Sequence, residues 1–367
     1  MYIKPSDLIL IISLGLLFIF LPTFANTPTA NNGEILELRE FQQYDKWGFI
    51  DKNDKIVIAP QYDLTWGFTE GLSAVKQNHK WGYIDKHNQT IIPFIYDDTY
   101  VFKQGLASVS KNNLWGFIDQ TGKTIIPFKY EDTKGFFREG LTAVKQHGKW
   151  GFINTKGNMV IPPLYDETYS FDQGLAVVML GDKFGFINKI GEVVIPIKYD
   201  AAWSFNHEDL TSVKLNDKWG FINKTGKTII PFKYDEAMYF INELAEVRQG
   251  DKWGLIDKND KAIIPFQYDE TIATHDNLIV VKLENHYGFI DRNGNVVIDI
   301  KYAHARPFKN GLAIVILGDK WGAINKSGDT VINFEYDYLL NLDQGLITAT
   351  QGDHTLTFDT TGKIIVK

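Results

Sequence analysis

Acidic side chains recur at one place along this chain, directly after a tyrosine. The members of this column are Asp63, Asp97, Asp166, Asp200, Asp235, Asp269 and Asp337. Two neighbouring carboxylates can act as acid and base in hydrolysis, and carboxylate oxygens can bind calcium. A catalytic pair belongs to one site, whereas these acids return in nearly every copy of a repeat. We therefore predict that they have a structural role and cap a turn.

Other residue types that support catalysis show no productive spacing. The chain has no cysteine, and its eight histidines lack the spacing of metal ligands. The DKNDK segments at Asp51 and Asp257 lack the glycine and the distal glutamate of a calcium loop. No hydrolase elbow, Walker loop or dinucleotide fingerprint occurs. The sequence thus predicts a protein that is not an enzyme, with no catalytic residues, no metal and no cofactor.

Two groups of residues are candidates for ligand binding. Trp66 and Trp203 lie in a variable stretch, at offsets that we take as non-equivalent, and exposed aromatics can stack on a sugar or contact a protein. The second group lies where the repeat departs most from its pattern, and it comprises His275, His286, His304 and Arg306. These side chains could gather on one face if neighbouring copies stack, and ordinary drift of the repeat is the alternative.

An aromatic residue followed by glycine recurs every 34 or 35 residues, which makes the chain a repeat protein. The aromatic column is Trp47, Trp81, Trp115, Trp150, Phe184, Trp219, Trp253, Tyr287 and Trp321, and Thr355 holds the same register in a degenerate tenth copy. Further columns of leucine, tyrosine and phenylalanine keep step with it. We predict that the aromatic column forms the structural core, and the alternative is a ladder of stacking platforms.

Each copy is predicted to hold three short antiparallel strands. In the fourth copy they are expected over 141–146, 149–154 and 158–161, with β-branched and aromatic residues throughout. A column containing only Gly, Asn and Asp predicts a hairpin turn with a left-handed residue. Prolines such as Pro127 are expected to end the third strand. The two 35-residue copies are expected to carry their extra residue between the phenylalanine and leucine columns.

The segment KWGFINKTGKTIIPFKYDEAMYF, from Lys218 to Phe240, resembles the WG-repeat family of bacterial proteins, also called KWG repeats. The resemblance runs from Leu38 to Lys367. It implies an extracytoplasmic or effector-type protein in which the repeats act as interaction or scaffold modules. No catalytic residue belongs to the family's repeat, so the resemblance assigns none.

Ten three-stranded copies are compatible with two all-β architectures. Propellers usually have about four to eight blades of four strands, whereas the polar residues of the tenth copy are typical of a terminal cap. We therefore favour an open β-solenoid, with a propeller-like closed ring as the alternative.

The N-terminus predicts export. Lys4 precedes an apolar stretch that runs from Leu8 to Leu21, and Thr23-Phe24-Ala25 offers a cleavage site. The stretch is shorter than the ~20 residues of a spanning helix. We expect a signal peptide over 1–25, a disordered linker over 26–34 and a repeat domain over 35–367, with no membrane span after cleavage. The protein is then periplasmic or secreted.

These features favour an exported, non-enzymatic repeat scaffold that mediates protein–protein interaction. A cell-envelope carbohydrate-binding module that uses exposed aromatics is the alternative. The net charge of −7 is spread without a basic stripe, which argues against a nucleic-acid partner.

Overall fold

The computed structural model describes residues 38–53, 55–274, 276–341, 345–352 and 354–366. The predicted signal peptide, linker and His275 lie outside these residues. The chain divides into a unit of residues Met1–Ile35 and a unit of residues Leu36–Lys367, and only the second is described here. The named elements in these ranges are β-strands, as predicted. Within the described ranges, no helix is long and apolar enough to cross a membrane.

The strands form ten small antiparallel sheets, here called blades 1 to 10, in which the strands follow one another in sequence order. Blade 1 contains β1 (Arg39–Gln43), β2 (Lys46–Ile50) and β3 (Ile56–Tyr62). Blade 2 contains β4 (Leu64–Thr69), β5 (Leu72–Gln77), β6 (Lys80–Ile84) and β7 (Thr90–Tyr96). Blade 3 contains β8 (Asp98–Thr99), β9 (Leu106–Lys111), β10 (Leu114–Asp119) and β11 (Thr124–Tyr130). Blade 4 contains β12 (Asp132–Thr133), β13 (Leu141–Gln146), β14 (Lys149–Asn154) and β15 (Met159–Tyr165). Blade 5 contains β16 (Glu167–Thr168), β17 (Leu175–Leu180), β18 (Lys183–Asn188) and β19 (Val193–Tyr199).

The second half of the unit repeats this plan. Blade 6 contains β20 (Ala201–Ala202), β21 (Leu210–Leu215), β22 (Lys218–Asn223) and β23 (Thr228–Tyr234). Blade 7 contains β24 (Glu236–Ile241), β25 (Leu244–Gln249), β26 (Lys252–Ile256) and β27 (Ala262–Tyr268). Blade 8 contains β28 (Glu270–Ile272), β29 (Ile279–Leu283), β30 (His286–Ile290) and β31 (Val296–Tyr302). Blade 9 contains β32 (His304–Ala305), β33 (Leu312–Leu317), β34 (Lys320–Asn325) and β35 (Thr330–Tyr336). Blade 10 contains β36 (Tyr338–Asn341), β37 (Ile347–Gln351), β38 (His354–Phe358) and β39 (Ile364–Val366).

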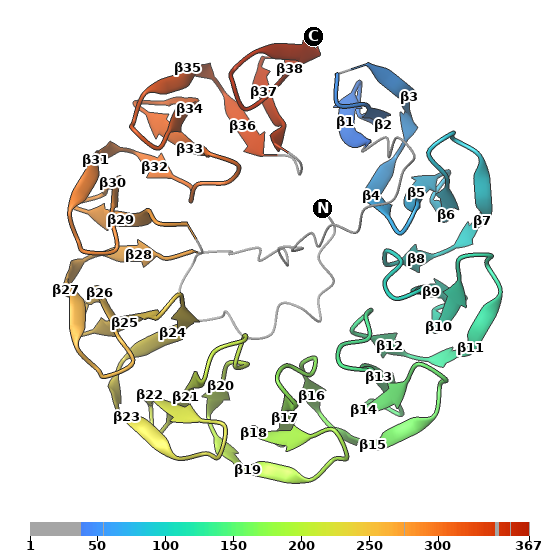
Figure 1. The fold of residues 1–367 in the computed structure, drawn as a ribbon, viewed down its shortest axis with the longest axis horizontal. Coiled ribbons are helices and arrows are strands. Elements are labelled where there is room, and N and C mark those ends of the chain that lie inside the picture. Colours follow the sequence, from blue (N-terminus) through green and yellow to red (C-terminus); the bar gives the residue numbers. More distant parts are fainter. Residues whose placement is uncertain (1–37, 54, 275, 342–344, 353, 367) are drawn as a thin grey trace, which may run out of the picture. The chain divides into compact units, whose positions relative to one another are not determined.

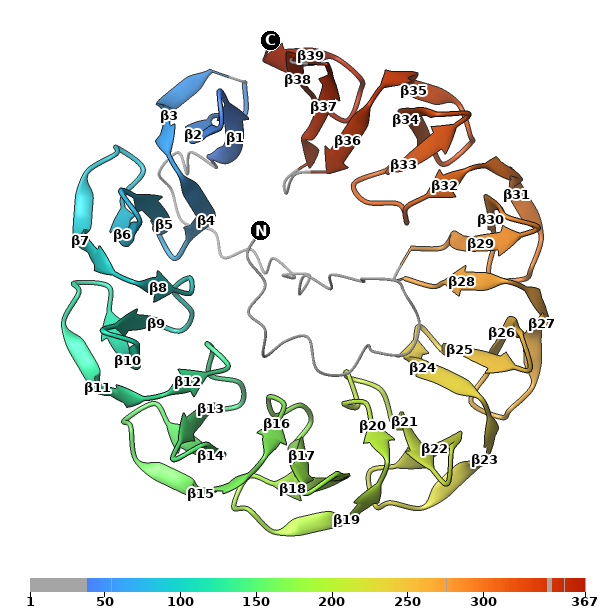
Figure 2. The ribbon, with the colours of Figure 1, turned by 180° about the vertical axis from the view of Figure 1, so that it is seen from behind.

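The prediction of three strands per copy was wrong for nine of the blades, because each of them has an additional inner strand. This strand follows the tyrosine column and is only two residues long in several blades, as in β8. Two residues are too few to show the alternation by which a strand is recognised in a sequence. The inner strand begins each blade, and the last strand of each blade lies at the perimeter (Figures 1 and 2).

The ten blades form a closed ring, so the open β-solenoid was the wrong choice of architecture. The closure is visible in one apolar cluster, in which Phe41 and Ile50 of blade 1 are buried together with Leu346 of blade 10. Blades 1 and 10 are accordingly neighbours in the ring (Figures 1 and 2). Packing the two terminal blades against each other removes two apolar faces from water, which an open array would leave exposed. The unit is a ten-bladed β-propeller.

Apolar clusters between neighbouring blades form the core. The aromatic column lies on the third strand, and each of its members pairs with the tyrosine at the end of the outer strand, as Trp150 does with Tyr165. Trp81, Trp115, Trp150, Phe184, Trp219 and Tyr287 are buried, and Trp47, Trp253 and Trp321 are partly buried. The phenylalanine column packs between neighbouring blades, since the ring centroids of Phe152 in blade 4 and Phe171 in blade 5 lie 4.8 Å apart.

The placement of the extra residue in the first 35-residue copy was wrong. Phe137, not Phe136, is the buried residue that packs on Phe117, with ring centroids 5.1 Å apart. The insertion therefore precedes the phenylalanine position in blade 4. In the other long copy Phe205 holds the expected position against Phe186.

The glycine after the aromatic column allows a close approach of two strands. A Cβ built on Gly151 would lie 2.5 Å from the backbone oxygen of Ile161 and 2.7 Å from the carbonyl carbon of Pro162. The outer strand bulges at this point, because the register shifts between the pairs Trp150–Tyr165 and Phe152–Ile161. The prolines were expected to end this outer strand, which is the third strand predicted for each repeat, and that expectation was wrong. They lie inside an edge strand, where a missing N–H breaks no ladder.

The turn chemistry of the repeat is confirmed. Asn88 has a φ of 64° and Gly122 a φ of 82°, so this column adopts the left-handed conformation that its residue types favour. The Asp or Asn three residues earlier accepts hydrogen bonds from the turn backbone. In one such turn, Asp119 Oδ1 accepts from the N–H groups of Thr121 at 2.9 Å and Lys123 at 3.0 Å.

Candidate functional site

The recurring aspartates have the structural role that was predicted. Each forms an ion pair with the lysine before the aromatic column of its own repeat, and the N–O distance is 2.6 Å for Lys183–Asp200 and 2.7 Å for Lys320–Asp337. The other pairs are Lys46–Asp63, Lys80–Asp97, Lys149–Asp166, Lys218–Asp235 and Lys252–Asp269. In several blades the second carboxylate oxygen accepts from a hairpin N–H, such as that of Gly250 on Asp235 at 2.8 Å. These acids therefore stabilise the hairpin turns.

This arrangement predicts an acid-sensitive fold. The hydrogen bond from Lys183 lowers the pKa of Asp200, and the same cause lowers the pKa of the equivalent aspartates. A carboxyl whose pKa is lower in the folded state stabilises the fold above its unfolded pKa, and this stabilisation is lost as the pH falls through the folded value. We expect the melting temperature to decrease below about pH 4.

The variant Asp200→Asn isolates one pair. It should melt below the parent at neutral pH, and the two melting temperatures should converge in acid, where the parent carboxyl is also neutral. Scanning calorimetry across the acidic range measures both. A constant difference between parent and variant at every pH would show that the ion pair does not contribute.

One position, which lies on the inner strand or directly after it, forms a row from blade 2 to blade 10, here called the inner-strand row. It lies 19 residues after the aromatic of the preceding blade, so Trp66 and Trp203, taken above as non-equivalent, occupy the same place. Arg306 belongs to it as well. The row, in chain order, is Trp66, Tyr100, Lys134, Tyr169, Trp203, Met238, Ile272, Arg306 and Leu340. Every member is partly or fully exposed.

Backbone and ring contacts hold this row in place. The N–H of Trp203 donates to the carbonyl oxygen of Ser212 on the second strand at 3.0 Å, and the N–H of Tyr169 donates to Val177 in the same way. Several members lie over the aromatic column of their own blade. The rings of Trp66 and Trp81 are stacked with centroids 5.9 Å apart, and the Lys134 amine lies 4.5 Å from the Trp150 ring.

The row deepens into a small pocket where three consecutive blades meet. The pocket has a volume of about 170 Å³ and is lined by Tyr169 of blade 5, Ala202, Trp203, Ser204 and Asn206 of blade 6, and Tyr239 of blade 7. Trp203 and Tyr239 meet edge to face, with ring centroids 5.7 Å apart and an interplanar angle of 63°. Three of its six lining residues are therefore aromatic.

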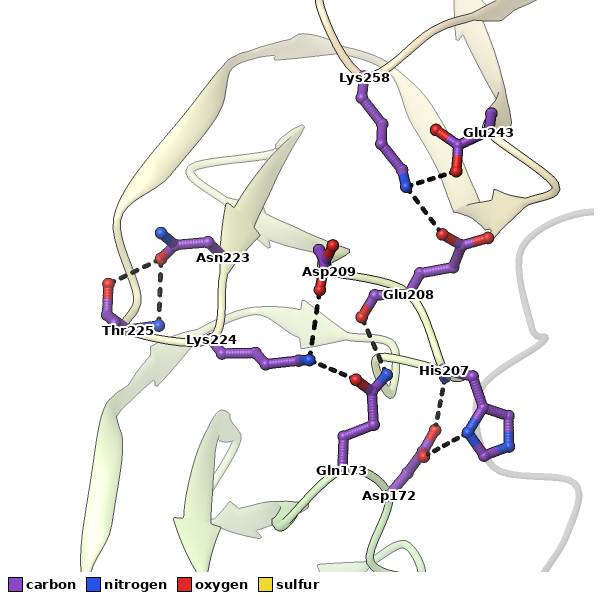
Figure 3. Close-up of polar contacts among 10 residues, drawn as sticks. All are labelled: Asp172, Gln173, His207, Glu208, Asp209, Asn223, Lys224, Thr225, Glu243 and Lys258. Atoms are coloured by element: carbon purple, nitrogen blue, oxygen red, sulfur yellow. Dashed lines mark hydrogen bonds and ion pairs between the residues drawn. The ribbon is translucent and has the colours of Figure 1, made fainter.

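A polar network joins the loops beside this pocket (Figure 3). Asp172 is nearly buried, and its carboxylate accepts from the backbone N–H of His207 at 2.9 Å and contacts the ring Nδ1 at 3.1 Å. Lys258 of blade 7 joins Glu208 of blade 6 at 3.0 Å and Glu243 of its own blade at 2.9 Å. Lys224 contacts Gln173 and Asp209. These contacts cross from blade to blade and fix the loops next to Asn206.

The predicted histidine group is only partly brought together. His304 is half-buried between the rings of Tyr287 and Trp321, and burial lowers its pKa, with Arg306 and Lys282 adding to the effect. The Arg306 guanidinium lies 5.0 Å from the Trp321 ring. His286 is exposed, and its ring contacts the carbonyl oxygen of Glu284. His275 lies outside the described residues.

Sequence reasoning missed a buried acid between blades 7 and 8. Glu246 is 8% exposed, and burial raises its pKa to about 8. Its carboxyl accepts from the Ala273 N–H at 2.8 Å. Ala74, Ser108 and Ala143 hold the equivalent position in blades 2 to 4, and blade 1 has Glu40 there, so an acid in a column of otherwise uncharged residues was the available signal. Burial raises the pKa of Tyr239, and the charge of Glu246 adds to the effect.

The ring of repeated antiparallel sheets and the row of inner-strand side chains define a repeat β-propeller. A family model described as "WG containing repeat" matches nine consecutive segments: residues 47–81, 81–115, 115–150, 150–184, 184–219, 219–253, 253–285, 287–321 and 321–353. The chain belongs to this family, as its resemblance predicted. Among curated proteins, none is significantly similar to the chain.

Solved structures show a similar fold at low identity. "Crystal structure of the eukaryotic initiation factor" is 9% identical, and the alignment covers 90% of this chain and 95% of that chain with a TM-score of 0.51. "Structure of Kluyveromyces lactis Hsv2p" is 8% identical, with 67% of this chain and 89% of that chain covered and a TM-score of 0.37. At 9% identity the first likeness shows the fold alone.

Proposed function

We propose that the protein is a non-enzymatic, exported repeat scaffold that binds a protein partner along the inner-strand row. The composition of the row is the observation that supports this proposal. Its members are tryptophan, tyrosine, methionine, arginine, lysine and aliphatic residues, and aromatics, Met and Arg are enriched at protein interfaces. A row that runs through nine blades presents these side chains to an extended partner.

The row and the perimeter each carry an exposed aliphatic side chain, and the two side chains are exposed to nearly the same degree. Leu340 is 41% exposed in the row and Ile229 is 40% exposed on the outer strand of blade 6. The two residues therefore form a matched pair for a test. If the partner lies along the row, truncating Leu340 removes a contact, whereas truncating Ile229 removes none.

The immobilised protein should capture a specific partner from a cell-envelope extract, and protease treatment of the extract should abolish capture. Trp66→Ala and Leu340→Ala should each weaken binding by up to tenfold, because that factor corresponds to about 1.4 kcal/mol at an interface position. Ile229→Ala should bind as the parent does. Equal losses in all three variants would contradict binding at the row. Export predicts that the mature protein begins at Asn26, and N-terminal sequencing of the exported protein checks this.

Glycan binding is the second candidate, and it is supported by the partly exposed tryptophans of the row. Trp66 is 38% exposed, and a sugar ring can stack on such a face. Captured material that survives protease digestion would favour this candidate. In that case Trp66→Ala or Trp203→Ala should weaken binding in protein that remains folded.

A further inference from the structure

We propose that the pocket of Tyr169, Trp203 and Tyr239 binds a quaternary ammonium group, such as the trimethylammonium head of choline. This site goes beyond the scaffold proposed above and does not depend on it. Three aromatic residues from three consecutive blades line the pocket, and only Ser204 and Asn206 add polar side chains. Cations with methylated surfaces are recognised by such aromatic walls, since the ring faces carry negative charge and the methyl groups need no hydrogen bond.

The size and shape of the pocket favour a compact group over a flat one. Its volume of about 170 Å³ is close to the roughly 150 Å³ of a cavity that holds a single benzene ring, so it admits one small group. Trp203 and Tyr239 meet at 63° and form a corner. A flat sugar ring stacks on one face of such a corner, whereas a tetrahedral trimethylammonium contacts both walls.

The charges beside the pocket also favour a cation. In the loops next to Asn206, the network of Figure 3 contains the carboxylates of Asp172, Glu208, Asp209 and Glu243 against the amines of Lys224 and Lys258. Asp172 is paired with His207, whose charge depends on protonation. Carboxylates outnumber amines in this network, and a local excess of carboxylates attracts a cation and repels an anion. The Lys134 amine, which lies 6.0 Å from the Tyr169 ring, shows that this wall already accepts a cation over its face.

The walls of the pocket are held in place before any ligand arrives. The Thr211 hydroxyl donates to the carbonyl oxygens of Trp203 at 2.7 Å and Ser204 at 3.1 Å, and the Trp203 N–H is bonded to the second strand. On the neighbouring blade, Tyr169 is anchored to Val177. Rigid walls reduce the entropy that binding costs, so a small group can bind without a rearrangement of the loops.

Choline and its uncharged isostere 3,3-dimethylbutanol, titrated into the purified protein by calorimetry, test the proposal without a variant. The two share a shape, so the cation–π contribution should make choline bind about tenfold more tightly. Equal affinities would overturn the proposal, as would binding of methyl glucoside in place of choline. Trimethyl-lysine, titrated in parallel, distinguishes a peptide source of the group from a choline source.

Variants then locate the site. Trp203→Ala and Tyr239→Ala should each weaken choline binding about tenfold or more, and Tyr239→Phe should retain it because the ring face remains. Tyr44→Ala, which removes an exposed aromatic from the turn of blade 1, serves as the control and should bind choline as the parent does. Melting temperatures confirm that each variant is folded. Unchanged choline affinity in folded Trp203→Ala and Tyr239→Ala would place the site elsewhere and contradict the proposal, whatever the outcome of the protein-capture experiment.

Discussion

Replacing Trp150 by alanine should lower the free energy of unfolding by about 3–5 kcal/mol, the range for truncating a buried aromatic. Trp150 is 1% exposed, pairs with Tyr165 across the strands and lies in a cluster that joins blade 4 to blade 5. The amine of Lys134 lies over its ring. The substitution therefore leaves a cavity and removes a cation–π contact. Urea unfolding followed by circular dichroism measures the change.

Trp150→Phe is the matched control. Phe184 occupies the equivalent position in blade 5, where it is 3% exposed, so this fold accommodates phenylalanine at the position. The control should be less destabilised than the alanine variant, because more of the ring volume remains. A melting temperature of Trp150→Ala within a degree of the parent would show that the aromatic column does not form the core.

Replacing Gly151 by alanine should cost about 1–3 kcal/mol, although only a methyl group is added. The new Cβ would meet the backbone of Ile161, Pro162 and Pro163 at 2.5–2.7 Å. Backbone atoms cannot rotate away as a side chain can, so the outer strand must shift and its pairing with the third strand must weaken. The same urea experiment measures the loss.

Gly148→Asn separates this clash from the general effect of losing a glycine. Gly148 has a φ of 74°, an added Cβ there meets nothing within 4 Å, and Asn113 holds the equivalent turn position in blade 3 with a φ of 61°. The control should stay within about 0.5 kcal/mol of the parent, as exposed substitutions usually do. If the two variants lose equal stability, the approach of the outer strand is not the reason for the glycine.

The sequence predicts the local structure of this fold better than its closure. The strands over 141–146 and 149–154 were predicted with their observed ends, because dense columns of apolar and turn residues mark them. The inner strands were missed because in several blades their backbone pairing rests on only two residues and because their side chains vary. Closure depends on a small rotation between neighbouring blades and on a contact between residues as distant as Phe41 and Leu346, which no local pattern records.

The sequence predicted only part of the candidate site, again because the residues at the inner strands vary from blade to blade. Trp66, Trp203 and Arg306 were chosen as departures from the repeat, yet they belong to a column of it that tolerates many residue types. Counting 19 residues from each aromatic would have united them and added Tyr169. The pocket itself needed the structure, because Tyr239 lies one position beyond the column and reaches the pocket from the irregular part of β24, where the register shifts between Ala237 and Phe240.

The outer strands carry exposed apolar residues such as Ile56, Ile125 and Val193, and in the described sheets each has only one pairing partner. Such edges invite copies of a protein to join into larger aggregates. Pro127 and its equivalents in blades 2 to 7 remove one donor from their edges, and the accompanying bulge bends the strand away from a straight template. Asp299 replaces this protection with a charge in blade 8, whereas blade 9 has only the neutral Asn333. Self-association of the folded protein should therefore begin at β35. The single substitution Asn333→Pro should then raise the solubility of the protein.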